Sequence, residues 1–446
     1  MNTDSALKKR LMSYARDDRD YWSFRGKAVR EHAHAYLQYP AMMVPQMQGE
    51  LIKVIREFAP GIKKVYDPFV GSGTVMTESM LQGLDFVGQD INPLAVLICQ
   101  TKKGPFFEKA LHKKIETLLN IIAEDSSHHI DIDFPNIFKW FRHDTSVELS
   151  RIRRAIRLET SIWSRRFFWV ALAETVRLSS NSRTSTFKLH IRPSPEIHER
   201  NISPVETFKN IIQNNLVKLS EIKKLLGEKG FLEKSKFRGT IDIKLADSAK
   251  SPLSPNHNKD RFDLLVTSPP YGDNVSTVPY GQYSYLPLQW IEKADIDSIT
   301  DDSFLSTTHE IDRRSLGGIR NAAIEASGEL TKISKTFSQT IKSLREEPRD
   351  RTIRVSAFCR DLNKCIDPIL SALNPGAYMA WTVGNRRVGK RTIAMDKILS
   401  EFLLARGAIK IVTLNRVIPS KRMAVKNNIS STMRMETILI FKKGNS

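Results

Sequence analysis

The chain has 446 residues, of which 41% are hydrophobic and 26% are charged, and its formal net charge is +20. These values are typical of a globular chain that forms one large domain or two smaller ones. A membrane protein is not expected, because no apolar run approaches the roughly 20 residues that a spanning helix requires. The polar start, MNTDSALKKRLMS, lacks the apolar centre of a secretion signal, so we expect a cytoplasmic protein.

The cysteines and the charge balance narrow the class of protein further. Cys99, Cys359 and Cys365 do not pair with another Cys or with a His at zinc-site spacing. The sequence therefore excludes a disulfide framework and predicts no metal site. The excess of Lys and Arg favours a polyanionic partner, because these side chains neutralise phosphates and release counterions. Basic solubility without any partner is the alternative.

Seven short runs rich in β-branched and aromatic residues predict strands. Amphipathic helical patterns separate most of them, for example at 47–58 and 362–374. This alternation predicts an α/β protein with a doubly wound, mostly parallel sheet. The last two runs leave no room for a full helix between them and predict an antiparallel terminal hairpin. The predicted strands are 63–69, 85–90, 240–247, 262–268, 377–384, 408–416 and 435–443.

Two long interruptions break this alternation. The first, at 101–239, carries apolar residues at helical spacing and predicts a mainly helical insert. The second, at 273–350, follows the fourth predicted strand. We therefore divide the chain into an N-terminal part of the sheet domain (1–100), the insert, and a C-terminal part of the sheet domain (240–446).

A glycine-rich turn follows the first predicted strand. The segment VYDPFVGSGTVMTESML (65–81) begins as a strand, passes through Gly-Ser-Gly and continues as a helix. Gly71 and Gly73 permit a tight turn and a close approach of a ligand to the backbone at a helix N-terminus. This layout indicates a nucleotide site, with a purely structural turn as the alternative. ATP is disfavoured, because the turn lacks the Lys-Ser/Thr of a P-loop.

Aspartates end three of the predicted strands. Asp67, Asp90 and Asp247 are expected at the carboxyl edge of one sheet, where open α/β folds bind ligands. Asp90 lies about twenty residues beyond the glycines, the spacing at which a carboxylate accepts hydrogen bonds from ribose hydroxyls. Capping of the next helix is the alternative role for Asp90.

The fourth predicted strand runs into the loop of DLLVTSPPYGDN (263–274). Two consecutive prolines remove backbone donors and fix φ, so a segment that needed only a turn would rarely contain both. DPFVGSGT followed by TSPPY resembles the S-adenosylmethionine-dependent amino-methyltransferases, most closely the cytosine-N4 and adenine-N6 DNA methyltransferases of bacteria. The resemblance extends to 39–52 and 416–443 but not to the two interruptions.

This resemblance implies a seven-stranded, Rossmann-like methyltransferase sheet, S-adenosylmethionine as cofactor and double-stranded DNA as partner. It implies that Asp90 binds the ribose and that Asp247 lies near the adenine. The residues that it implies at the methionine end are Asp67, Phe69, Gly71, Gly73 and Thr74.

The chemistry of amine methylation explains why such an enzyme would need the Ser-Pro-Pro-Tyr loop. An exocyclic amine is a poor nucleophile, because its lone pair is delocalised into the base. Ser268 Oγ and the Pro269 carbonyl are expected to accept hydrogen bonds from the amine, leaving its lone pair facing the methyl donor. Pro270 stiffens the loop, and Tyr271 stacks against a base extruded from the duplex. Serine is too weak a base to deprotonate the amine first, so proton loss follows methyl transfer. A rigid turn with a packed tyrosine is the alternative.

The first interruption is the predicted DNA-recognition region. Between residues 139 and 192, arginines are interleaved with aromatic residues, and arginine contacts both phosphates and guanine. A solvated helical face beside a separate aromatic core is one alternative, and recognition by 273–350 is another. The predicted DNA-binding residues are Arg153, Arg154, Arg157 and Arg183.

The sequence thus predicts a DNA cytosine-N4 methyltransferase that acts on a flipped cytosine. We expect the protective half of a restriction-modification system, whose endonuclease acts on the same site without a stable complex. Ser268 favours cytosine, since serine usually accompanies cytosine in the resembling families and can both accept and donate a hydrogen bond. The alternatives are an adenine-N6 or RNA base methyltransferase and a non-catalytic nucleic-acid-binding protein.

Overall fold

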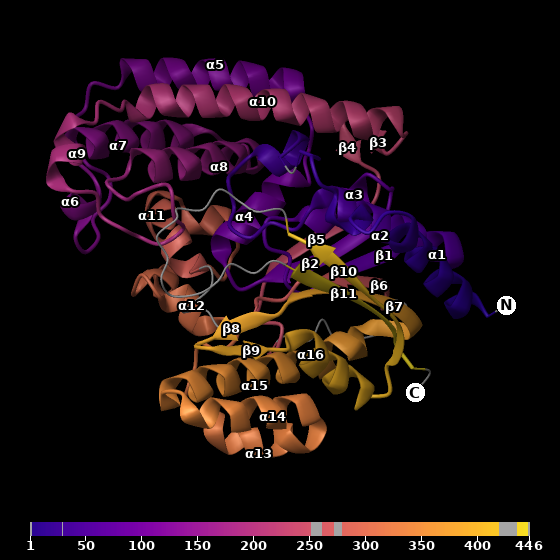
Figure 1. Ribbon diagram of the computed structural model, residues 1–446. Helices are drawn as coiled ribbons and strands as arrows, with labels where there is room; N and C mark the ends of the chain where they lie inside the picture. The colour runs from indigo at the N-terminus through magenta and orange to yellow at the C-terminus, as the bar shows by residue number, and fades with distance from the viewer. Residues whose placement is uncertain (1, 29, 251–260, 272–278, 419–434, 445–446) are drawn as a thin grey trace.

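The structure is a computed structural model that describes residues 2–28, 30–250, 261–271, 279–418 and 435–444. Its centre is a seven-stranded sheet with helices on both faces (Figure 1). The strand order is β10-β11-β7-β6-β1-β2-β5. These strands are β1 Lys64–Asp67, β2 Asp85–Asp90, β5 Ile241–Leu245, β6 Phe262–Thr267, β7 Leu373–Gly384, β10 Ile409–Val417 and β11 Met435–Lys442.

The strand pairing confirms the predicted doubly wound sheet and its antiparallel hairpin. β1 pairs in parallel with β2 and β6, while β5 and β7 extend the parallel part at either side. β11 pairs antiparallel with both β7 and β10. The hairpin therefore closes one edge of the sheet, and β11 lies between β10 and the remaining strands.

Alternating side chains divide the sheet between two hydrophobic cores. Leu264 on β6 faces one core, and the next residue, Leu265, faces the other. On β11, Ile438 and Ile440 lie in the first core and Leu439 lies in the second. Successive residues of a strand point to opposite faces, so a strand covered on both sides is apolar at nearly every position.

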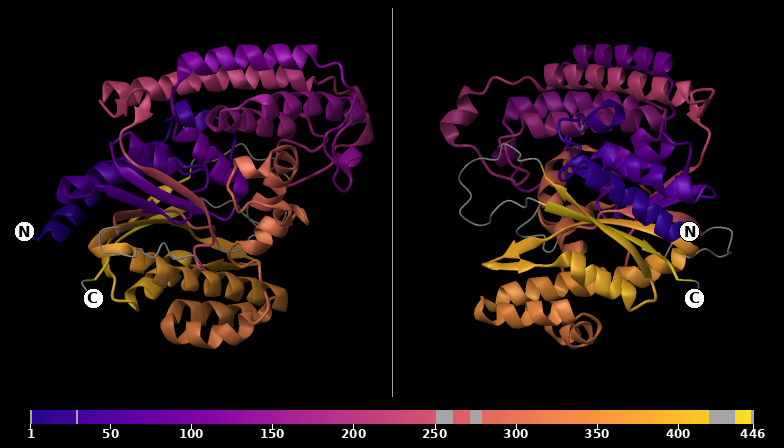
Figure 2. Two further views of the ribbon diagram at one scale, coloured as in Figure 1. Left: turned by 180° about the vertical axis from the view of Figure 1, so that it is seen from behind. Right: turned by 45° about the vertical axis from the view of Figure 1, so that its right-hand side comes forward.

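Separate groups of helices cover the two faces (Figure 2). One group packs in the core of Leu265 and consists of α13 Ala323–Ile333, α14 Lys335–Ser343, α15 Arg349–Ala372 and α16 Met395–Leu404. The other packs in the core of Leu264 and includes α1 Thr3–Asp17, α2 Pro45–Phe58, α3 Thr74–Met80 and α4 Pro93–Lys102. No helix in the described part of the chain has both the length and the apolar character that crossing a membrane requires.

The first interruption is mainly helical, as predicted, and lies on the side of the sheet opposite to α13–α16 (Figures 1 and 2). Its long helix α8 is almost entirely buried among α7, α10, α4 and α11 Tyr280–Trp290. The helices are α5 Glu108–Glu124, α6 Ile137–Trp140, α7 His143–Leu158, α8 Ile162–Ser179, α9 Ser194–Glu199 and α10 Pro204–Glu228.

Ion pairs and hydrogen bonds join this insert to the second interruption. Arg165 pairs with Asp295, in the 3-10 turn Lys293–Asp295 after α11, and the indole of Trp169 donates to the same carboxylate at 2.7 Å. Arg166 donates to the Asp295 carbonyl at 2.6 Å. The first part of the second interruption therefore packs against the insert, whereas its later helices α13 and α14 lie on the other face of the sheet. A further helix in the second, α12 Glu310–Arg314, packs on α11.

Small features complete the fold. The sequence did not predict two short hairpins, β3 Leu232–Glu233 with β4 Lys236–Phe237 and β8 Arg386–Val388 with β9 Arg391–Ile393. The first helix is tied to two neighbouring strands of the sheet, because Asp4 accepts hydrogen bonds from Tyr378 on β7 and from Lys442 on β11.

Candidate active site

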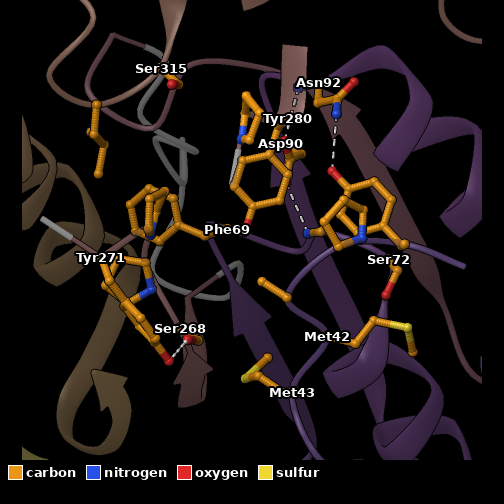
Figure 3. A pocket seen from close by; sticks show the side chains of 18 of the residues that line it. Met42, Met43, Phe69, Ser72, Asp90, Asn92, Ser268, Tyr271, Tyr280 and Ser315 are labelled. Carbon is orange, nitrogen blue, oxygen red and sulfur yellow. Dashed lines mark hydrogen bonds between the residues drawn. The ribbon is translucent and has the colours of Figure 1, made fainter. Parts of the chain in front are cut away.

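A large cavity opens at the carboxyl ends of β1, β2, β5 and β6. As the described residues bound it, its volume is about 2550 Å³, which exceeds the roughly 300–1,000 Å³ of most small-molecule pockets. The glycine loop, Asp90, Asp247 and the Ser-Pro-Pro-Tyr loop all line it. In Figure 3, Ser268 and Tyr271 lie on one side of the cavity and Asp90 and Asn92 on the other, with Phe69 between them.

The turn from β1 into α3 has the backbone that its glycines predict. Gly71 has φ +50° and Gly73 has φ +77°, in the left-handed region where a side chain is strained. A Cβ on Gly73 would also lie 2.9 Å from Sγ of Cys99 on α4. Gly71 lines the cavity, whereas Gly73 caps α3 behind it. Gly71 thus allows a ligand to approach the backbone, and Gly73 allows α3 to pack closely on α4.

Two side chains of α4 donate hydrogen bonds to backbone carbonyls of the glycine loop. Cys99 Sγ donates to the Gly71 carbonyl at 3.3 Å, and Lys102 Nζ donates to the Ser72 carbonyl at 2.7 Å. Lys102 is only 2% exposed, and burial lowers its pKa to about 8. Sequence reasoning missed this lysine, because nothing in its spacing links it to a loop thirty residues earlier.

Asp90 holds two backbone segments at the wall of the cavity through hydrogen bonds. Its Oδ2 accepts from the Gly71 amide and its Oδ1 from the Asn92 amide, both at 2.9 Å. Burial raises the pKa of Asp90 to about 6, although these amides oppose the rise, so the carboxylate is mainly ionised at neutral pH. A carboxylate has about four acceptor positions, so Asp90 keeps acceptor capacity for ligand hydroxyls. Asp90 therefore holds the loop and retains acceptors for a ribose.

The other two strand-end aspartates have different surroundings. Asp67 is fully buried, where its Oδ1 accepts from Thr267 Oγ1 at 2.6 Å and from the Phe69 amide at 3.0 Å. Burial raises the pKa of Asp67 to about 7. Asp247 lines the cavity and accepts from the Ala249 amide at 3.0 Å. Asp67 thus positions the loop from behind, whereas Asp247 faces the ligand space.

Asn92 links three elements at the cavity wall. Its amide donates to the Tyr39 hydroxyl at 3.0 Å and to Ser284 Oγ on α11 at 2.8 Å, while its Oδ1 caps α4. The Tyr39 ring stacks on Tyr280 at a centroid distance of 5.9 Å. Sequence reasoning did not single out these residues, although Tyr39 begins a segment (39–52) that carries the family resemblance.

The Ser-Pro-Pro-Tyr loop places its polar groups in a hydrogen-bonded chain. Ser268 Oγ lies 3.0 Å from the Tyr271 hydroxyl, and that hydroxyl donates to Glu436 Oε1 at 3.2 Å. Pro269 and Pro270 also line the cavity. Burial, and then the Glu436 carboxylate, raise the pKa of Tyr271 well above its ordinary value, so the phenol remains protonated.

Glu436 and Arg416 complete this side of the cavity. They face each other across β10 and β11, with Arg416 Nη1 at 2.9 Å from Glu436 Oε2. The Arg416 side chain is only 4% exposed. Sequence reasoning missed both roles, because Glu436 stands 165 residues after Tyr271.

The four predicted DNA-binding arginines lie in different surroundings. Arg153 pairs with Asp131 and Glu292, and Arg154 pairs with Asp125 and Asp131. Arg157 is about half exposed and lies 4.0 Å from Glu292. None of these three lines the cavity as the described residues bound it, whereas the exposed Arg183 does.

The aromatic residues of the same segment belong to a core. Trp169 and Phe141 are fully buried, and Trp140 is 8% exposed. The interpretation of an arginine-aromatic DNA surface was therefore wrong for the aromatic residues, because their rings pack inside the insert. These rings form the separate aromatic core of the alternative interpretation, whereas DNA binding by the arginines stays a prediction.

A buried histidine pair packs behind the glycine loop. Ligand atoms of His32, His34 and Glu78 lie within 4.8 Å of one another, and His34 Nε2 is 3.0 Å from Glu78 Oε1. Burial, and then the nearby Lys102 ammonium, lower the pKa values of both histidines, to about 4 for His32. A cation here would be repelled by Lys102, so we assign the cluster a packing role between the 32–35 turn and α3.

The residues of the cavity fit S-adenosylmethionine. Gly71 leaves the backbone open to a ligand, and Phe69 supplies an apolar wall. Asp90 and Asp247 supply the acceptors that ribose hydroxyls and an adenine amine require. The Ser268 hydroxyl lines the same cavity. A methyl acceptor bound at Ser268 would therefore share the cavity with the cofactor that supplies the methyl group.

Comparison with known proteins identifies the family. No family model matches the chain. The chain is 31% identical over 456 residues to the type II methyltransferase M.MvaI of Kocuria varians, with 98% of this chain and 97% of that protein covered. It is 32% identical over 108 residues to the type II methyltransferase M.MjaII of Methanocaldococcus jannaschii, with 24% of this chain and 20% of that protein covered.

One solved structure gives a much looser match. It is the rRNA methyltransferase aviRa of Streptomyces viridochromogenes, with 11% identity, a TM-score of 0.28 and coverage of 93% of this chain and 96% of that one. A TM-score this low carries no argument. The relation to M.MvaI spans almost the whole of both chains, and on that ground the present chain belongs to the type II methyltransferase family and takes its methyl group from S-adenosylmethionine.

Proposed function

We propose that the protein is a DNA methyltransferase that modifies the N4 amine of a cytosine extruded from duplex DNA. The observation that carries this proposal is the presence of the Ser-Pro-Pro-Tyr loop and the glycine loop in one cavity. The relatives are named type II methyltransferases, which supports a role as the protective half of a restriction-modification system.

The chain's own residues orient the amine. Ser268 Oγ and the Pro269 carbonyl accept its two hydrogen bonds, so that the nitrogen lone pair points away from them. Tyr271 offers a ring face to an extruded base while its hydroxyl is held by Glu436. When bound, S-adenosylmethionine supplies a methyl group activated on a sulfonium sulfur. The volume of the cavity, about 2550 Å³, leaves space for a base beside the cofactor.

The charge around the cavity favours DNA as the substrate. Carboxylates that line the described cavity wall are at least partly buried, whereas many of its basic side chains are exposed to solvent. Such an arrangement attracts a phosphate backbone toward the catalytic loop. The exposed basic residues are Lys27, Arg30, Arg183, Lys188, Lys250, Lys364 and Arg387.

The test of the proposed function is the identity of the methylated base. DNA incubated with the protein and S-adenosylmethionine labelled in its methyl group, then digested to nucleosides, is expected to carry label in N4-methylcytosine by mass spectrometry. Label in N6-methyladenine would contradict the base assignment and preserve the amine chemistry. Label in 5-methylcytosine would contradict both, since carbon methylation needs a different nucleophilic step. In a parallel reaction with RNA, label in the RNA and none in the DNA would contradict DNA as substrate.

The segment 183–190 of the first insert is expected to contact DNA directly. It contributes Arg183 and Lys188 to the cavity wall, both exposed. Changing both to Gln removes two phosphate contacts, so duplex affinity should fall and the slope of log Kd against log salt should decrease by about 2. The matched control changes Lys8 and Lys9 to Gln, because these lysines are exposed on α1 and do not line the cavity.

Fluorescence anisotropy with a labelled duplex at several salt concentrations measures both quantities. Equal losses in the two double variants would show that net charge, and not this segment, sets the affinity. The arginines Arg153 and Arg154 are unsuitable for this test, because their replacement breaks ion pairs with Asp131 in the insert and, for Arg153, also with Glu292 beyond it.

A further inference from the structure

Three contacts beside the catalytic loop join four groups in an ordered chain. Ser268 Oγ contacts the Tyr271 hydroxyl at 3.0 Å, which contacts Glu436 at 3.2 Å, which in turn pairs with Arg416 at 2.9 Å. Each hydroxyl has one proton to donate, and an ionised carboxylate can only accept. The position of every proton in the chain therefore depends on its far end.

Arg416, at the end of the chain away from Ser268, decides which group donates in each hydrogen bond. The buried guanidinium of Arg416 keeps an ionised carboxylate beside it, because an unpaired buried charge is costly. The Tyr271 hydroxyl must then give its single proton to Glu436. Tyr271 can only accept from Ser268, and Ser268 must donate its single proton to Tyr271.

We propose, on the basis of the proposed function, that Glu436 is a positioning residue that acts through Tyr271 to make Ser268 a hydrogen-bond acceptor toward the target amine. With its only proton turned toward Tyr271, Ser268 Oγ presents lone pairs to the cavity. Both hydrogens of the amine then find acceptors, one on Ser268 and one on the Pro269 carbonyl. A serine that pointed its proton at the amine would instead repel it.

The same chain removes the proton that methyl transfer leaves on the amine. As the methylated nitrogen gives a proton to Ser268 Oγ, the serine proton passes to the Tyr271 oxygen and the phenolic proton passes to Glu436 Oε1. One N–H bond is broken and one new O–H bond is formed on Glu436. The base becomes neutral and the carboxylate becomes a carboxylic acid. Glu436 is 15% exposed and the Arg416 guanidinium favours its ionised form, so the acid form is transient and returns the proton to water.

An acceptor-only serine also changes the argument about the base. Donation from Ser268 to cytosine N3 would require the proton that Tyr271 already receives. The serine alone therefore orients an amine and does not itself distinguish cytosine from adenine. The proposed choice of cytosine then rests on the resemblance to the methyltransferases that carry serine in this loop, and not on the direction of the serine hydrogen bond.

Glu436→Gln and Tyr271→Phe test this inference. The first keeps the size of the side chain but removes the charge, and the second keeps the aromatic ring but breaks the chain. We expect each to lower kcat by about 100-fold, near the lower end of what a positioned proton acceptor contributes. The KM values for DNA and S-adenosylmethionine should change little, and the double variant should be no slower than either single one.

The controls separate positioning from folding. Glu436→Asp retains a carboxylate and should recover part of the activity. Asp263→Asn removes a partly buried carboxylate of β6 that does not line the cavity and should leave kcat unchanged, since Asp263 accepts from the Lys63 and Lys64 amides rather than joining the chain of hydroxyls. Tyr271→Phe disturbs the fold least, so it remains informative where Glu436→Gln leaves Arg416 unpaired and unfolds the protein.

Wild-type protein is assayed in parallel with labelled cofactor. No transfer to DNA by the folded wild type would overturn the proposed function and this inference with it. Transfer by the wild type together with unchanged kcat in folded Tyr271→Phe or Glu436→Gln would overturn this inference alone. Fully additive losses in the double variant would also overturn it, because two links of one chain cannot fail independently.

Discussion

Ser268→Ala is expected to lower the methylation rate by about 10² to 10³-fold, the effect of removing one preorganised hydrogen-bonding group at a reacting centre. The methyl side chain cannot accept a hydrogen bond from the amine, so the nitrogen lone pair stays delocalised in the base. Binding of cofactor and duplex should remain nearly normal, because the lost contact matters mainly in the transition state. Single-turnover transfer of labelled methyl measures the rate, and separate titrations measure binding.

Ser400→Ala is the matched control for this change. Ser400 on α16 is also buried, and its hydroxyl donates to the Asp396 carbonyl at 2.7 Å. We expect a small loss of stability and a normal rate. A Ser268→Ala variant with wild-type turnover would remove Ser268 from the mechanism, whereas parallel losses in both variants would indicate a general effect on the fold.

Asp90→Ala is expected to weaken S-adenosylmethionine binding by roughly 100-fold, since loss of charge-assisted hydrogen bonds of about 3 kcal/mol corresponds to that factor in Kd. Two effects add in the same direction. The ribose loses its acceptor, and the Gly71 amide loses the carboxylate that holds the glycine loop at 2.9 Å. Calorimetric titration of the folded protein with the cofactor measures the change.

Asp85→Ala provides the comparison within the same strand. Asp85 begins β2, at the opposite edge of the sheet, and also accepts from a backbone amide, that of Thr240 at 2.6 Å. Its loss should affect stability but leave cofactor affinity unchanged. Normal binding by Asp90→Ala would place the ribose elsewhere, and equally weak binding by both variants would point to loss of the strand rather than of a ligand contact.

The sheet and the glycine loop could be predicted from the sequence because both depend on local patterns. Each strand of the sheet core is a short apolar run, and Gly71 and Gly73 require a left-handed backbone that few other residues adopt. Because parallel strands deliver their carboxyl ends to one edge, the order of motifs was enough to bring Asp90, Asp247 and Ser268 to one cavity.

The partners of charged residues could not be predicted in the same way. Arg153 is basic in sequence, yet in the structure it pairs with Asp131 and Glu292, which lie in different segments. The sequence gives the charge of a side chain, but it does not show which carboxylate forms an ion pair with it. Glu436 was missed for the same reason, because its contact with Tyr271 depends on how β11 enters the sheet.

The place of β11 has a consequence for biosynthesis. β10 leaves the ribosome before β11, yet β11 is the strand that joins β10 to β7. Until β11 emerges, β10 is attached only to earlier segments, such as Ser23, whose hydroxyl accepts from the Val417 amide at 3.0 Å. Insertion of β11 completes the sheet and delivers Glu436 to Tyr271 in one step. Until β11 has been synthesised, the sheet is therefore incomplete and Tyr271 lacks its Glu436 partner.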